Sequence, residues 1–174
     1  MIIIDIFAKK LYAIRYNNDE LDVYNKLIEN WTDVQFVREF VKKHQKDIAE
    51  KNLNKVIKDI ISDAEDIDDL LYELSNSKNE NIGHFFAPLF NSEYQVQLLS
   101  RQKGRVHKKS YTRIYGIKIE SNCFVITGGA IKFTRFMQDR HHTNQELINI
   151  NKVKDYLNDK GVIDKDTLQD LDIQ

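Results

Sequence analysis

The sequence predicts an α+β domain, in which a small antiparallel sheet (a three-stranded meander plus an N-terminal strand) carries helices on one face. Three observations support this fold class. Apolar residues recur at helical spacing through residues 19–75, and they alternate with polar residues in parts of 94–133. One capped helix is expected at 143–160. Helices that precede a run of hairpin-linked strands are typical of the α+β class, and the length fits a single domain, 1–174.

The N-terminal half begins with a strand at Lys10–Tyr16, which can continue from Ile2–Phe7. A turn and helix cap follow at Asn17-Asn18-Asp19, and Thr32-Asp33 supplies a second cap. The polar run 75–81 ends the helical block. Three amphipathic helices are predicted from apolar residues at helical spacing: Leu21, Tyr24, Leu27, Ile28 and Trp31; Val34, Val37, Phe40 and Val41; and the run from Leu53 to Leu74.

The meander is predicted from three strand-like segments, in the first of which Gln95 and Gln97 alternate with Val96 and Leu98. These are Glu93–Arg101, Ser110–Glu120 and Cys123–Phe133, with a tight turn at Ser121-Asn122 between the last two. The aromatic segment around Pro88 is expected to connect the helices to the meander and to pack against the sheet. Glycines 128 and 129 indicate either a close backbone approach or, as we favour, a β-bulge.

The C-terminal helix is predicted at Gln145–Asn158. Thr143 and Glu146 have the spacing of a capping box, and Gly161 is placed to end the helix. The remaining residues, Asp164–Gln174, are expected to add at most one short helix.

Positive charge is concentrated in one segment. Residues 101–140 hold ten lysines and arginines against two acids, whereas residues 1–80 have a net charge of −5. A cationic segment of this kind either binds a polyanion such as RNA, through an electrostatic attraction that weakens as salt rises, or is a solvated strand face. The residues expected to hold RNA phosphates are Arg101, Lys103, Arg105, Lys108, Lys109 and Arg135.

Other features exclude several classes of protein. The single cysteine, Cys123, excludes an internal disulfide, and no apolar run reaches the length of a membrane span. The opening residues lack a basic segment, so the cytoplasm is the expected compartment. No metal site or cofactor is expected. The acidic run Asp63–Asp69 is either a solvated helix face or a contact with the cationic strands.

Two motifs resemble a known family. Arg113 lies in the segment 111–117, and the apolar segment 124–132 follows after the tight turn and ends in Gly-Gly-Ala-Ile-Lys132. With the capped helix, this pattern resembles the C-terminal half of RelE/HigB-type toxins, in particular the phage-derived variety. The resemblance covers mainly residues 94–158 and implies a RelE/ParE-like fold with an enlarged helical N-terminal half. Phe133 stands where the family has a second lysine, and Thr143-Asn144 where it has Thr-Pro.

The resemblance implies the toxin of a type II toxin–antitoxin system, acting as an mRNA endoribonuclease without a metal. Its implied partners are RNA, including ribosome-bound mRNA, and a cognate antitoxin, with a homodimer left open. In such chemistry Arg113 and Lys132 would face the phosphorane charge, Tyr115 would position the phosphate, and His142 or His141 would exchange protons. The alternatives are a non-catalytic RNA- or protein-binding module, or a mobile-element protein whose sheet serves assembly.

Overall fold

The computed structural model describes residues 1–96, 98–134 and 141–171, and at residues 142 and 143 the backbone alone. The strands are β1 (Ile2–Phe7), β2 (Leu11–Arg15), β3 (Phe86–Pro88), β4 (Ser100–Gly104), β5 (Thr112–Glu120) and β6 (Cys123–Ile131). The α-helices are α1 (Val23–Thr32), α2 (Val34–Lys43), α3 (Leu53–Asn76), α4 (His141–Asp159) and α5 (Lys165–Gln169), and short 3₁₀ helices span Gln45–Asp47, Ile82–Phe85 and Asn91–Gln95.

The strands of the described residues form one six-stranded mixed sheet in the order β1-β2-β6-β5-β4-β3. The pairs are antiparallel except β2 with β6, which run parallel with Leu11 opposite Phe124. The α+β class is therefore confirmed, but the prediction of a small, wholly antiparallel sheet was wrong. Alternation within a strand does not specify its neighbour, and the β2–β6 contact joins segments far apart in the chain.

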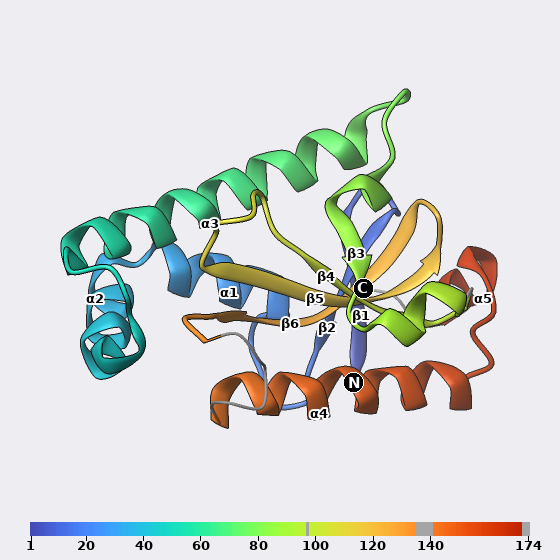
Figure 1. Ribbon diagram of the computed structural model, residues 1–174. Helices are drawn as coiled ribbons and strands as arrows, with labels where there is room; N and C mark the ends of the chain where they lie inside the picture. The colour runs from blue at the N-terminus through green and yellow to red at the C-terminus, as the bar shows by residue number, and fades with distance from the viewer. Residues whose placement is uncertain (97, 135–140, 172–174) are drawn as a thin grey trace.

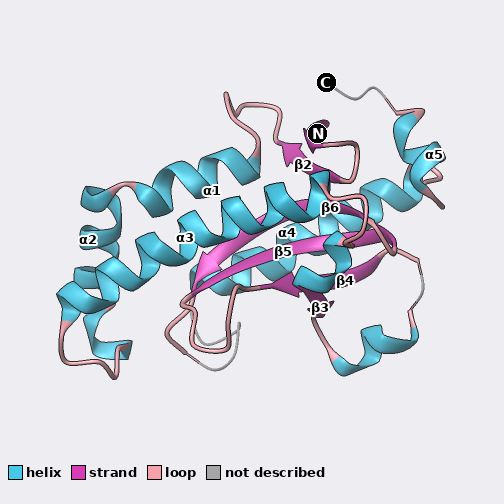
Figure 2. Ribbon diagram, turned by 90° about the horizontal axis from the view of Figure 1, so that it is seen from above, coloured by secondary structure: helices cyan, strands magenta, loops and turns pink. Residues whose placement is uncertain are grey.

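Helices cover both faces of the sheet (Figure 1), where α3 lies on one side and α4 on the other. Helices α1 to α3 enclose a core that includes Ile114 and Ile126, and α4 encloses a second core that includes Ile117 and Val125. Figure 2 shows the same arrangement from above, with α1 and α3 crossing the sheet side by side. The prediction of helices on one face was wrong, because an apolar stripe shows that a helix is buried but not against which face.

The predicted helical block is confirmed as α1, α2 and α3. Two aspartates begin the first two helices: Asp22 accepts hydrogen bonds from the backbone of Tyr24 and Asn25, and Asp33 accepts them from Gln35 and Phe36. The second cap was predicted. The first lies three residues beyond the predicted Asp19.

The last two strands of the meander match the prediction closely, since β5 and β6 flank the Ser121-Asn122 turn. The first strand does not. Residues 91–95 form a 3₁₀ helix and β4 begins at Ser100, so the strand extends to Gly104, beyond the predicted end at Arg101. The pairing of β4 with β3, a strand absent from the prediction, fixes its position.

The C-terminal region confirms the helix but not its predicted start. Helix α4 begins at His141, so Glu146 lies inside the helix and faces β6 instead of closing a capping box. At the other end, Gly161 has φ +73°, and Val162 and Gly161 donate to the carbonyls of Leu157 and Asn158 in a Schellman motif. The short helix α5 follows. Among the described residues, no helix is both long enough and apolar enough to cross a membrane.

Candidate phosphate-binding pocket

An open pocket of about 950 Å³ lies at the end of the sheet where β5 begins and β6 ends. Four basic residues line it: Lys103 from β4, Arg105 just beyond it, Arg113 from β5, and Lys132 just after β6. The segment from His84 to Asn91, which contains β3, forms the wall next to β4, and Tyr115 and Thr134 complete the lining. Residues predicted separately as catalytic and as phosphate-binding therefore share one pocket.

Strand register brings these side chains to one face. Lys103 lies opposite Tyr115 in the β4–β5 ladder, and Arg113 lies opposite Ala130 in the β5–β6 ladder. Directly opposed residues of antiparallel strands project to the same face, and residues two apart along a strand do so too. Lys132, two residues after Ala130, continues that face, and its backbone N–H donates to Tyr111 at 2.8 Å.

Arg113 is held in a fixed direction. Its Nη1 donates to the carbonyl oxygens of Ser110 and, at 2.7 Å, of Thr112. Burial, and then the charge of Arg105, lower the pKa of Arg113 to about 10, so the guanidinium stays charged at neutral pH. The guanidinium also carries N–H donors on Nε and Nη2, in a fork that matches two phosphate oxygens.

Lys103 and Arg105 add charge on the β4 side. Burial lowers the pKa of Lys103, and the charges of Arg105 and Arg113 lower it further. Its Nζ donates to the carbonyl of Leu89 at 3.2 Å, and Arg105 donates to the carbonyl of Lys108 at 3.0 Å. Arg105 therefore lies close enough to Lys103 and Arg113 to lower the pKa of both, and the three cations can attract one anion together.

Tyr115 is placed differently from the prediction. It lies on the pocket face beside Arg113, as period two requires, but its side chain is only 1% exposed. Burial raises its pKa, with a smaller rise from Glu146. Tyr115 therefore forms part of the buried support of the pocket.

Arg101, predicted to hold RNA, is engaged in a structural contact. Its Nε donates to Glu93 Oε1 at 2.6 Å, its backbone N–H donates to Glu93 Oε2 at 2.9 Å, and Nη1 donates to Asn151 at 2.9 Å. Its guanidinium also lies over the Phe90 ring, 5.2 Å from the centroid. Glu93 is buried, so this ion pair joins β4, the preceding 3₁₀ helix and α4 outside the pocket lining.

The other predicted residues divide into two groups. Lys108 and Lys109 are exposed on the β4–β5 connection and do not line the described pocket. Arg135 and the side chain of His142 lie outside the described residues. His84, which the prediction missed, is exposed in the pocket wall. Asp63 is buried beside the β4–β5 connection, in line with one of the two alternatives left open for the acidic run. Asp63 belongs to an acidic run on a helix whose buried residues recur at helical spacing. That spacing was a weak indication in the sequence that Asp63 is buried.

Among the described residues, histidine, cysteine, aspartate and glutamate side chains do not form a group of three or more that could hold a metal ion. No protein-family model, curated protein or solved structure matches this chain. The chemistry of the pocket is therefore inferred from the residues that line it.

Proposed function

We propose that this protein binds RNA phosphates in the pocket and cleaves the RNA there, as a metal-independent endoribonuclease. The observation that carries the proposal is the convergence of Lys103, Arg105, Arg113 and Lys132 in one pocket. A phosphodiester is the common biological anion whose charge and fork-shaped oxygens suit a guanidinium flanked by ammonium groups. Lys108 and Lys109, exposed on the β4–β5 connection, would contact neighbouring phosphates of the same strand.

Cleavage would follow the chemistry of an internal nucleophile. The ribose 2′-oxygen loses its proton and bonds to the adjacent phosphorus, while the bond from phosphorus to the 5′-oxygen breaks and that oxygen takes a proton. The products are a 2′,3′-cyclic phosphate and a free 5′-hydroxyl. Arg113 and Lys132 would stabilise the charge on the phosphorane oxygens. The His84 imidazole and Lys103, whose pKa is lowered, are pocket groups able to exchange the two protons, and His142 stays a predicted third.

This activity would suit the toxin of a toxin–antitoxin pair, with RNA as its substrate and an antitoxin protein as its partner. A second candidate is a non-catalytic module that binds RNA through the same pocket. Phe133 favours the second candidate. Its ring lies 6.0 Å from Phe40 and 5.5 Å from Tyr111, packed against the core under α1–α3, so this position adds no second cation to the pocket.

The test compares two labelled oligouridylates in the presence of EDTA, one all-ribose and one with 2′-deoxyribose throughout. The proposal expects the protein to bind both and to cut only the first, leaving a cyclic phosphate end. Binding of both without cleavage, with ribosomes absent and present, would leave the non-catalytic module as the function.

Variants of the pocket sharpen the test. Arg113→Ala or Lys132→Ala should lower the cleavage rate by about 10²–10³ and relieve any growth arrest caused by expression. Lys118→Ala is the matched control, because Lys118 lies on β5 but outside this pocket. Equal rates for all three variants and the wild type would exclude cleavage in this pocket.

A further inference from the structure

We propose that Asp63, in the middle of α3, is a positioning residue for Arg113 and acts through the single peptide group between Ser110 and Tyr111. The inference rests on the proposed function, because it explains how the pocket arginine is oriented. It also gives part of the acidic run a role within the molecule.

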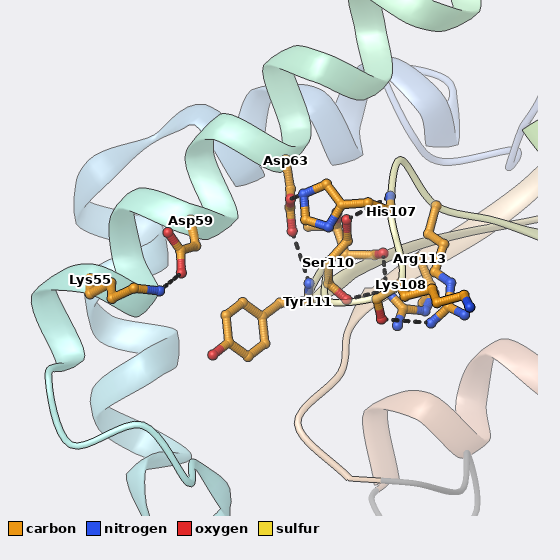
Figure 3. A network of polar contacts seen from close by, with 10 residues as sticks. Lys55, Asp59, Asp63, His107, Lys108, Ser110, Tyr111 and Arg113 are labelled. Carbon is orange, nitrogen blue, oxygen red and sulfur yellow. Dashed lines mark hydrogen bonds and ion pairs between the residues drawn. The ribbon is translucent and has the colours of Figure 1, made fainter.

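Asp63 is the buried carboxylate of the acidic run Asp63–Asp69, with an exposure of 3%. Its Oδ2 accepts the backbone N–H of Tyr111 at 2.8 Å, and its Oδ1 lies 3.4 Å from His107 Nε2. One turn earlier, Asp59 pairs with Lys55 at the surface. Figure 3 shows Asp63 facing the β4–β5 connection from α3, with the His107 imidazole directed toward it and the backbone nitrogen of Tyr111 next to it, while the Tyr111 ring points away.

The peptide group that Asp63 holds is the one that orients Arg113. The N–H of Tyr111 and the C=O of Ser110 belong to the same planar peptide unit, and they point in opposite directions. Asp63 accepts from the N–H, and Arg113 Nη1 donates to the C=O. Because the peptide unit is planar, a hydrogen bond that fixes the Tyr111 N–H also fixes the direction of the Ser110 C=O. The Asp63 carboxylate therefore sets the direction in which this carbonyl faces the Arg113 guanidinium.

Electrostatics favours the same arrangement. A carboxylate at the N–H end polarises the peptide, which makes its carbonyl oxygen a stronger acceptor for the positive guanidinium at the other end. Burial raises the pKa of Asp63, and the Tyr111 backbone, the Ser110 hydroxyl and His107 partly offset that rise. These partners let a carboxylate remain buried between a helix and a loop.

The loop itself is closed by local contacts. The backbone N–H of His107 donates to Ser110 Oγ, and the N–H of Ser110 donates to the His107 carbonyl, both at 3.1 Å. Arg105 donates to the Lys108 carbonyl within the same connection. The connection is therefore a small rigid unit, and Asp63 joins it to α3 across the edge of the core.

The experiment measures the affinity of the full chain for a fluorescein-labelled oligouridylate. Asp63→Asn keeps the shape and one acceptor oxygen for Tyr111 but removes the charge. Its matched control is Asp66→Asn, an exposed position on the same helix. Net charge alone predicts tighter binding to RNA in both variants. The proposal instead expects Asp63→Asn to weaken binding by roughly tenfold and Asp66→Asn to leave it unchanged or slightly tighter.

A double-mutant cycle separates positioning from simple destabilisation. Asp63→Asn should have no further effect on affinity in an Arg113→Ala background, but its full effect in a Lys132→Ala background. Equal losses in both backgrounds, or wild-type affinity for Asp63→Asn alone, would overturn the proposal.

A readout without RNA keeps the two proposals distinguishable. In Asp63→Asn, hydrogen exchange of the Tyr111 amide should accelerate and the NMR signal of Arg113 Nε–H should shift, while Asp66→Asn leaves both unchanged. If the wild type fails to bind RNA, the proposed function fails, and these signals still decide whether Asp63 positions Arg113. Signals that are identical in the wild type and Asp63→Asn would refute it.

Discussion

The carboxylate of Glu146 lies against the backbone of Gly128, where α4 crosses β6. A Cβ atom at Gly128 would overlap Glu146 Oε2, so the close approach requires glycine. Oε2 is buried without a hydrogen-bond partner among the described residues, and Oε1 accepts from Asn149 at 3.4 Å. Burial raises the pKa of Glu146 to about 7, and the Asn149 side chain and, less strongly, the Gly129 backbone oppose that rise. The pair joins α4 to the face of the sheet that holds the pocket.

The stability of the protein should therefore depend on the protonation of Glu146. Because its pKa is higher in the folded chain, about 7 against an ordinary 4.5, the folded state binds more protons between these values. The contribution of Glu146 to stability is then fully present below about pH 4.5 and is lost as pH rises from there to about 7, by about 3 kcal/mol in total. Urea unfolding of the wild type and Glu146→Gln across this range measures the effect.

The difference between the two stability curves isolates Glu146, since other groups contribute equally to both proteins. Glu146→Gln should match the wild type near pH 4 and exceed it near pH 8, because the amide carries no charge to bury. A difference that does not change with pH would show that the carboxyl group has an ordinary pKa in the folded protein.

The Glu93–Arg101 pair should matter for stability and not for RNA. Glu93→Ala leaves the guanidinium without its buried partner and should cost about 2–3 kcal/mol of unfolding free energy, at the low end for a broken buried pair because Arg101 is partly exposed. The exposed Lys55–Asp59 pair is the control, and Lys55→Ala should cost less than about 0.5 kcal/mol.

Arg101→Ala completes the comparison, because the sequence alone assigned this residue to RNA. At a temperature where the variant is fully folded, its affinity for oligouridylate should equal that of the wild type. A loss of affinity as large as that of Arg113→Ala would place Arg101 in the RNA interface after all.

RNA binding should depend on salt through the cations of the pocket. Each phosphate contact releases counterions, so a plot of log affinity against log salt should become shallower by about one unit for each pocket cation removed. The prediction applies to alanine variants of Lys103, Arg105, Arg113 and Lys132. Lys118→Ala should keep the wild-type slope. A wild-type affinity that is the same at low and moderate salt would show that the cationic segment is a solvated surface.

Local features of this chain could be predicted from sequence because local physics sets them. Apolar spacing gave α1, α2 and α3, Asp33 marked the second helix start, and Gly161 marked the end of α4. Gly128 and Gly129 mark close approaches, the alternative to the bulge that was favoured there, because a Cβ at either position would overlap neighbouring atoms; the register irregularity lies beside them, at Thr127. These features depend on a few neighbouring residues.

Pairings between distant segments escaped the prediction. The parallel β2–β6 contact, the short β3 and the placement of α4 on the second face all depend on which surfaces meet. One signal was present: the run Phe124-Val125-Ile126 is apolar on both faces, as in a strand covered by helices on each side. The prediction of a meander with one exposed face did not take this apolar run into account.

The sequence by itself determined that positive charge lies in one segment and that Arg113 and Tyr115 share a strand face, because composition and strand period are properties of the chain. Only the tertiary structure decided which cations act together. Strand register and the wall that contains β3 place four cations around one pocket: Lys103, Arg105, Arg113 and Lys132. Arg101 instead forms an ion pair with Glu93 outside the pocket lining. The tertiary structure also decided which acid is buried. Asp63 contacts a loop that is distant in the chain, and a buried charge is tolerated only where hydrogen-bond donors such as the Tyr111 N–H surround it.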